Sequence, residues 1–227
     1  MNVQVAIDGP AGAGKSTVAR LLARRLGVAY VDTGAMYRCL ALLSLRRGIA
    51  PGNAEALAEL ARTLRIRFAP EADGQRVWMF DDDVTAAIRS EEVGGLAPAV
   101  AGHAAVREWL VESQKQLAAR NEGIVMDGRD IGTAVLPAAP VKIFLTASLA
   151  VRAQRRFEEL TARGFAVTPA QVRALVEERD RVDGTRSVSP LRAAADAVIL
   201  DTTCLTPREA VAMIAALCAE RAADRIE

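Results

Sequence analysis

Five apolar runs along the chain predict the strands of a sheet. They occupy residues 3–7, 28–32, 123–127, 141–146 and 197–201. Each run is of strand length and nearly continuous, which is typical of strands covered on both faces. Segments with a helical spacing of apolar residues alternate with them, the first at 17–26. This alternation predicts an α/β fold in which helices flank a five-stranded parallel sheet and connect its strands by right-handed crossovers.

The stretch from about 64 to 104 interrupts this rhythm. Apolar and polar residues alternate with period two on both sides of Asp73-Gly74, which predicts an antiparallel hairpin. Two helical segments follow, at about 85–94 and 103–120. We therefore expect a small α+β subdomain at 63–104, inserted into a core made of residues 1–62 and 105–227.

A second excursion, from Ser148 to about Arg186, predicts two helices joined at Arg163-Gly164-Phe165, the second capped by Thr168-Pro169. Arginines are dense here. Arginine and glutamate at helical spacing usually mark a solvated face, and we assign Arg152, Arg163 and Arg173 to such a face. Arg155 and Arg156 lie about 100° apart around a helix, so that only one of them is expected to face a ligand.

Composition narrows the class of protein. The 227 residues are 51% hydrophobic and carry a net charge of +1, which favours a globular core and argues against long nucleic acid as a partner. Cys39, Cys204 and Cys218 lack metal-site spacing and suggest a reducing compartment. No secretory leader and no apolar run of membrane-spanning length is visible. We expect a cytoplasmic monomer that contacts no membrane.

Residues 9–16, GPAGAGKS, match the phosphate-loop pattern G-x-x-x-x-G-K-[ST] between a predicted strand and a predicted helix. The glycines let backbone N–H groups converge on an anion at a helix N-terminus. Lys15 would reach the β and γ phosphates and Ser16 would hold Mg²⁺; a plain glycine-rich turn is the alternative. The residues expected to bind ATP are Gly9, Pro10, Ala11, Gly12, Ala13, Gly14, Lys15, Ser16 and Thr17.

A second anion site is predicted beside the first. The second and third core strands end in charged clusters, Asp32–Arg38 and Asp127–Asp130. Since the carboxyl ends of parallel strands share one edge of the sheet, Arg38 and Arg129 should face the same ligand. The guanine-reading signature N-K-x-D is absent from the sequence. A second anion site indicates a transferase whose acceptor is itself a phosphate, for which no general base is obligatory.

Five segments together resemble the bacterial cytidylate kinases over nearly the whole chain. They are VAIDGPAGAGKST, DTGAMYR, DGRDIGT, RDRVDGTR and SPLRAAADAVILDTT. The resemblance implies a nucleoside monophosphate kinase that transfers the γ-phosphate of ATP to CMP or dCMP with Mg²⁺. It also implies that the insertion binds the monophosphate and that a mobile helical lid lies within about 148–187.

The resemblance assigns roles residue by residue. The residues that it assigns to phosphoryl transfer are Lys15, Arg129, Arg186, Arg155 and Arg156. The residues that it assigns to binding of the acceptor CMP are Thr33, Arg38, Arg107, Arg129, Asp130, Asp183 and Arg186. Asp130 and Arg107 would read cytosine, because a carboxylate accepts from the exocyclic amine, where uracil carries a carbonyl. Asp127 would hold magnesium through water, and the alternative for it is a plain strand-end carboxylate. The alternative for Arg129 and Asp130 is an ion pair with each other.

Two residues depart from the family pattern. Pro98 and Gly184 stand where serines often occur, and Pro98 offers neither a hydroxyl nor an N–H to the base. Base selectivity against UMP and the preference between CMP and dCMP therefore stay open. Two other functions also stay open: a kinase for UMP or AMP, and a non-catalytic nucleotide-binding module. We assign Asp81–Asp83 to a solvated turn or strand end, and Trp78, Phe80 and Trp109 to apolar packing.

Overall fold

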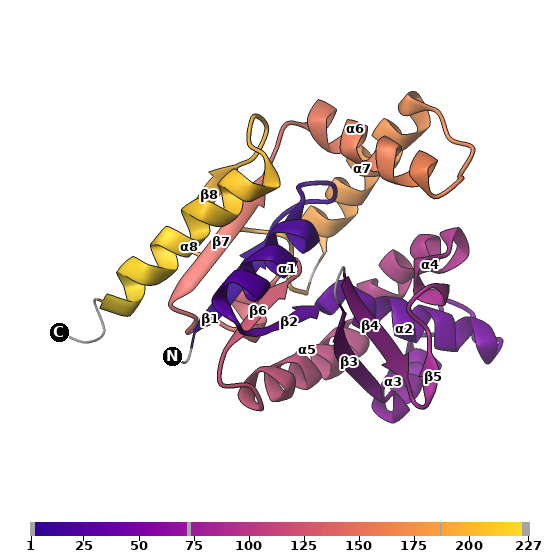
Figure 1. Ribbon diagram of the computed structural model, residues 1–227. Helices are drawn as coiled ribbons and strands as arrows, with labels where there is room; N and C mark the ends of the chain where they lie inside the picture. Colours follow the sequence, from indigo (N-terminus) through magenta and orange to yellow (C-terminus); the bar gives the residue numbers. More distant parts are fainter. Residues whose placement is uncertain (1–2, 72–73, 187, 224–227) are drawn as a thin grey trace.

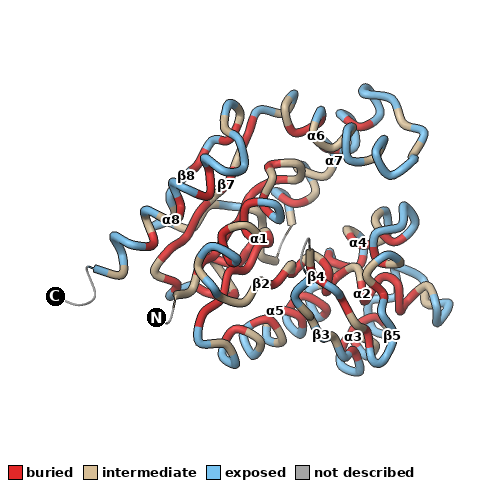
Figure 2. The backbone as a smooth tube through the Cα atoms, viewed as in Figure 1, coloured by how far each residue is buried: buried red, intermediate tan, exposed pale blue. Residues whose placement is uncertain are grey.

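The computed structural model describes residues 3–71, 74–186 and 188–223. As predicted, its main sheet has five parallel strands; the structure shows that they lie in the order β2-β6-β1-β7-β8 (Figure 1). The strands are β1 (Gln4–Asp8), β2 (Ala29–Asp32), β6 (Ile124–Asp127), β7 (Val141–Thr146) and β8 (Val198–Asp201). Buried residues follow β1, β6 and β7 closely (Figure 2), which is why the sequence shows unbroken apolar runs there. By contrast, β2 is mostly half-buried, and Val198 and Ile199 of the edge strand β8 are exposed.

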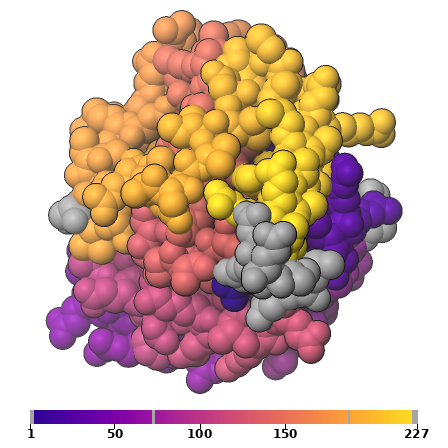
Figure 3. All heavy atoms as spheres, turned by 90° about the vertical axis from the view of Figure 1, so that its left-hand side faces the viewer, coloured from indigo at the N-terminus to yellow at the C-terminus, as the bar shows by residue number. Residues whose placement is uncertain are grey.

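Helices cover the sheet. One apolar cluster joins α1 (Lys15–Leu26) and α8 (Pro207–Ala223) to β1 and β7. A second joins α5 (Ala104–Ala119) and a π-helical turn at Ile131–Val135 to β6. Figure 3 views the molecule from the side on which the C-terminal part of the chain, in orange and yellow, occupies the upper half.

The predicted hairpin is present as β3 (Ile66–Glu71) and β4 (Gly74–Met79), extended by a short third strand, β5 (Asp82–Asp83). Asp73 of the expected turn lies outside the described residues. A large apolar cluster packs this sheet against α2 (Thr33–Arg46), α3 (Ala54–Thr63) and α4 (Glu91–Gly102). The first turns of α5 belong to the same cluster through Val106 and Leu110.

The helix expected at 85–94 is wrong in position. A 3₁₀ turn covers Ala87–Arg89, and α4 then starts after Ser90, whose side chain accepts a hydrogen bond from the backbone N–H of Val93. The helix continues through Pro98. Proline inside a helix costs about 3 kcal/mol, and the buried apolar face that α4 presents to α2 offsets this cost.

The second excursion forms the expected pair of helices, α6 (Leu149–Ala162) and α7 (Pro169–Thr185). Thr168 and Gln171 form a reciprocal capping box at the start of α7. At the tip of the pair, the guanidinium of Arg163 donates to the backbone oxygen of Arg89 beside α4. Within the described part of the chain, no helix has the length and apolar character needed to cross a membrane.

Two aromatic side chains contradict the expectation of apolar packing. Phe80 is 44% exposed and Trp109 is 39% exposed, because Phe80 occupies a turn with a positive φ and Trp109 lies on the outer face of α5. Trp78 is half-buried and stacks under the guanidinium of Arg67. Cys39 and Cys218 are buried, whereas Cys204 is exposed.

Replacing Leu40 by alanine tests the apolar cluster beneath the hairpin. Leu40 is fully buried on α2, so Leu40→Ala should lower the free energy of unfolding by about 2–5 kcal/mol. Leu175→Ala is the matched control, because Leu175 is 61% exposed on α7, and it should change that energy by less than about 0.5 kcal/mol. Urea unfolding of both variants measures the difference; equal losses would contradict the packing described.

Candidate active site

The phosphate loop lies between β1 and α1, where the pattern places it. Gly9, Gly12 and Gly14 all have positive φ values. Two of them also approach other segments closely: a Cβ on Gly9 would lie 1.9 Å from the backbone oxygen of Leu145, and one on Gly12 would lie 2.6 Å from that of Arg152. Glycine is therefore required both by the backbone conformation and by the packing of the loop on β7 and α6.

Lys15 is buried in the first turn of α1 and donates from Nζ to the backbone oxygen of Pro10, at 2.7 Å. Burial and the nearby charge of Arg129 lower the pKa of Lys15. An anion in the loop would reverse this effect, since it favours the charged ammonium. The residue thus occupies a position that is more favourable with a phosphate bound than without.

Asp127 connects three segments at the carboxyl end of β6. Its carboxylate accepts from the hydroxyl of Ser16 at 2.8 Å and from that of Tyr30 at 2.9 Å. Its backbone oxygen accepts from the Thr33 hydroxyl at 2.8 Å. Burial, followed by the charge of Asp32, raises the pKa of Asp127. The oxygen donors of Ser16 and Asp127 are the type that Mg²⁺ prefers, so the residues present fit this ion.

Asp183, near the end of α7, is surrounded by three arginines. It lies 2.7 Å from Arg129, 3.4 Å from Arg179 and 3.4 Å from Arg186. Burial acts to raise the pKa of Asp183, but the arginines, Arg129 first, outweigh burial and hold that pKa below its ordinary value. The structure thus brings together three of the residues expected at the acceptor, Arg129 from the segment after β6 and Asp183 and Arg186 from the C-terminal end of α7.

Asp130 pairs with Arg107 of α5, at 2.5 Å, and both side chains are buried. Because Arg129 pairs with Asp183, the Arg129–Asp130 pair that the sequence left open is not the arrangement seen. On the other side of the site, Arg38 pairs with Asp32 at 2.6 Å. The expected acceptor residues therefore lie in two neighbouring ion-pair groups and one separate pair, each arginine held by a carboxylate.

The arginines of α6 point in different directions. Arg155 donates to the backbone oxygen of Thr202 at 2.7 Å and lies 3.5 Å from that of Ala13 in the phosphate loop. Arg156 instead pairs with Glu159 on an exposed face. Of the two candidates, only Arg155 contacts the loop.

The assignment of Arg152 to a solvated face is wrong. Arg152 is buried, donates to the backbone oxygen of Ala11 at 3.1 Å and pairs with Asp180 of α7 at 2.6 Å. Arg163 is two-thirds buried and contacts Arg89, whereas Arg173 faces solvent as expected. The helical spacing could not reveal these contacts, because the partners of Arg152 and Arg163 lie on other elements.

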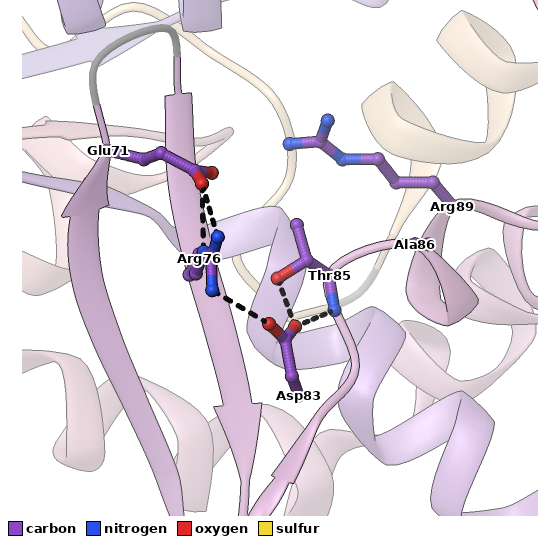
Figure 4. Close-up of a pocket in the computed structure, with 6 residues that line it drawn as sticks. All are labelled: Glu71, Arg76, Asp83, Thr85, Ala86 and Arg89. Atoms are coloured by element: carbon purple, nitrogen blue, oxygen red, sulfur yellow. Dashed lines mark hydrogen bonds and ion pairs between the residues drawn. The ribbon is translucent and has the colours of Figure 1, made fainter.

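The acidic run Asp81–Asp83 is exposed at the end of the hairpin, as expected. Asp83 borders a hollow of about 370 Å³ on the insertion, where it accepts from Thr85 and pairs with Arg76 (Figure 4). Over residues 3–71, 74–186 and 188–223, no group of three or more histidine, cysteine or acidic side chains could hold a metal ion.

Sequence reasoning missed three residues that shape the site. Asp8 is buried at the end of β1 and accepts from the backbone N–H groups of Ile131 and Gly132. Tyr30 holds one oxygen of Asp127. Thr202 is buried and donates to the phosphate loop at Ala13. Asp8 and Thr202 do end apolar runs at the same sheet edge, a signal that identifies them once the edge is recognised.

The fold and the site define a P-loop kinase. Two solved structures share the fold at low sequence identity. One is a gluconokinase from Sinorhizobium meliloti 1021, with a TM-score of 0.52, 15% identity, and coverage of 99% of this chain and 96% of that one. The other is a shikimate kinase from Bacteroides thetaiotaomicron, with a TM-score of 0.50, 13% identity, and coverage of 95% and 97%.

Within that class, the chain belongs to the cytidylate kinase family, whose model matches residues 5–220. It is similar to cytidylate kinases from Geobacillus sp. (strain WCH70), 47% identical over 97% of this chain and 98% of the relative, and from Pelotomaculum thermopropionicum, 50% identical over 93% and 94%. The one from Limosilactobacillus fermentum is 52% identical over 94% of both chains. The resemblance drawn from the motifs is confirmed.

Asp8 should make stability depend on pH. Burial raises the pKa of Asp8 from 3.8 to about 6. A carboxyl whose folded pKa is raised stabilises the protein fully below about pH 4 and loses this contribution as the pH rises through about 6. Asp8→Asn cannot lose a proton, so its unfolding free energy relative to the unmodified protein should rise by up to about 3 kcal/mol between those limits.

Urea unfolding at about pH 4 and about pH 7 measures this difference. Asp81→Asn, at an exposed position, is the control and should show the same difference at both values. A difference for Asp8→Asn that does not move with pH would contradict the burial of a titrating carboxyl.

Proposed function

We propose that the protein transfers the γ-phosphate of ATP to CMP or dCMP, giving ADP and CDP or dCDP. One observation carries the proposal: a single strand end, Asp127–Asp130, contacts the phosphate loop through Ser16 and the acceptor residues through Arg107 and Asp183. Donor and acceptor sites therefore adjoin, which in-line phosphoryl transfer requires. The family membership supports the same reaction.

The positive groups of the site would bind phosphates in place of their present partners. In this proposal the loop N–H groups and Lys15 bind the donor phosphates, with Lys15 released from Pro10. Arg38, Arg129 and Arg186 bind the acceptor phosphate, and Thr33 lies beside it. Such charge-assisted contacts act in a site that excludes water, where they stabilise developing negative charge strongly. The acceptor oxygen is already largely ionised near neutral pH, so it needs no general base.

Ser16 and, through water, Asp127 would hold Mg²⁺. A bound magnesium ion neutralises charge on the β and γ phosphates and orients them. The residues themselves contribute the placement: Tyr30 and Ser16 fix both oxygens of the Asp127 carboxylate, so its orientation is set before substrate arrives.

Base selection is assigned to Asp130 and Arg107. A carboxylate at Asp130 accepts from the amine of cytosine and repels the carbonyl of uracil, a difference of about 1–3 kcal/mol per good contact. Asp183 is assigned to the sugar. Pro98, within α4, offers no hydrogen-bond donor, so the protein's own base contacts rest on the Arg107–Asp130 pair.

We assign the remaining segments by the same reasoning. Residues 63–104 serve as the monophosphate-binding insertion and about 148–187 as a lid whose closure excludes water, so that ATP is not hydrolysed. The protein works as a cytoplasmic monomer whose ligands are small nucleotides, with no membrane and no nucleic acid polymer as a partner.

A coupled assay with ATP and CMP, dCMP, UMP or AMP tests the function. CMP and dCMP should turn over fastest; equal turnover of UMP or AMP would refute the base assignment.

Lys15→Ala should lower kcat at least about 100-fold, because it removes a charge held at the transferring phosphate. Lys115→Ala, exposed on α5, should leave it unchanged. ATP binding without any transfer by the unmodified protein would indicate a non-catalytic module.

Arg155 and Arg156 form a natural matched pair. Arg155 contacts the phosphate loop and Arg156 an exposed glutamate. We predict that Arg155→Ala lowers kcat/KM for ATP by about tenfold or more, as expected for loss of a charged hydrogen bond worth about 1.5–3 kcal/mol. Arg156→Ala should stay within about twofold. Steady-state kinetics with varied ATP measures both; a larger loss at Arg156 would reverse the assignment.

A further inference from the structure

Three neighbouring side chains, one of them Arg107 of the base-reading pair, hold buried polar atoms that lack partners. They are the hydroxyl of Tyr37, Nε of Arg107, and both amide atoms of Gln114. None has a hydrogen-bond partner among the residues that the structure describes. The side chains are nearly inaccessible: Gln114 is 1% exposed, Arg107 2% and Tyr37 9%.

These atoms belong to one place in the fold. Arg107 and Gln114 lie on the buried face of α5 with Leu110 between them, and a helical side chain leans toward the N-terminal turn, here toward Arg107. Tyr37 comes from α2, and the Arg107 guanidinium lies 5.4 Å from the centre of its ring. Burial raises the pKa of Tyr37 to about 12, and the Gln114 amide opposes this rise as a hydrogen-bond donor near the hydroxyl would, although the two groups do not meet the distance and angle of a regular hydrogen bond. The three side chains therefore lie close together between α2 and α5.

Leaving such atoms without partners is costly. Each unsatisfied buried donor or acceptor costs about 1–3 kcal/mol, and folded proteins satisfy nearly all of them with protein or ordered water. A direct contact between Tyr37 and Gln114 would still leave Nε of Arg107 unpaired. A water molecule suits the whole group, because it can accept from Arg107 and Gln114 and donate to Tyr37 or to the amide oxygen.

We propose that Tyr37 and Gln114 enclose a buried water that accepts from Nε of Arg107, and that both are positioning residues for base recognition. This inference rests on the proposed function. One terminal nitrogen of the planar Arg107 guanidinium pairs with Asp130. The other donates to the backbone oxygen of Ala101 through a long hydrogen bond of 3.4 Å. A water bound to Nε would restrict rotation of the Arg107 guanidinium. It would thereby hold the orientation of the Asp130 carboxylate, which accepts a hydrogen bond from the cytosine amine.

Loss of the water contact should change the preference for CMP over UMP and leave the rate of phosphoryl transfer, measured as kcat, nearly unchanged. Without it the Arg107 fork can turn, and Asp130 then loses the orientation that distinguishes an amine from a carbonyl. The donor site is unaffected, because Lys15 and Ser16 have no contact with Gln114 or Tyr37 among the interactions of the described residues. Acceptor KM and the CMP-to-UMP ratio are therefore the quantities to measure.

The test compares Gln114→Leu with Gln116→Leu, since Gln116 is an exposed glutamine on the same helix. For Gln114→Leu we expect KM for CMP to rise about tenfold, kcat and KM for ATP to stay within about twofold, and the CMP-to-UMP ratio of kcat/KM to fall about tenfold, the equivalent of one good base contact. Gln116→Leu should change none of these. Tyr37→Phe removes one oxygen and should act in the same direction.

The double variant Tyr37→Phe, Gln114→Leu should lose less than the product of the two single effects, since both act through one water. An unchanged CMP-to-UMP ratio, or equal rises in KM for ATP and CMP with a lowered melting temperature, would overturn the inference and indicate a structural role. If Gln114→Leu does not fold, Tyr37→Phe decides by the same criteria. An unmodified protein that does not phosphorylate CMP overturns the proposed function itself.

Discussion

Compensation of buried charge at the carboxyl edge of the main sheet governs the whole site. Asp8, Lys15, Asp127, Asp130 and Asp183 are all buried there, and a buried charge is strongly unfavourable unless it is paired or hydrogen-bonded. Each carboxylate is accordingly held: by backbone N–H groups, by hydroxyls or by arginines. The partners come from the phosphate loop, β2, the π-helical turn, α5 and α7, so the pairing also fixes how these elements meet.

In the proposed function, the same compensation prepares the site for anionic ligands. Arginines that are already aligned by carboxylates lose little side-chain freedom when a phosphate replaces or joins the carboxylate. Arg129 and Arg186 share Asp183, which keeps two positive charges close together before any phosphate is present. Without Asp183 their mutual repulsion would separate them. A carboxylate thus organises a site whose proposed ligands are themselves negative.

The sequence predicted the features that local patterns encode. Strands buried on both faces give unbroken apolar runs, and the phosphate loop has a fixed spacing of glycines before a helix.

Local signals failed where packing decides the structure. Gly94, Gly95 and Pro98 all oppose a helix. Burial of Val93, Ala97 and Val100 nevertheless holds α4 together. Likewise, the exposure of Arg152 depends on Ala11 and Asp180, which no helical spacing can indicate. Motifs located the expected site residues at one edge, but which acid pairs with which arginine depends on contacts across 54 positions, as for Arg129 and Asp183.

Arg152 has a mechanical consequence for the helical pair α6–α7. Its guanidinium joins the phosphate loop at Ala11 to Asp180 on α7, and its own helix packs on Gly12. The pair is therefore attached to the phosphate loop at its root, and at its far end Arg163 contacts the backbone oxygen of Arg89. If the pair moves as the proposed lid, it must pivot about Arg152, so that its displacement would be transmitted to the phosphate loop. In the proposed function, the position of these helices and the conformation of the phosphate loop are therefore coupled through one side chain.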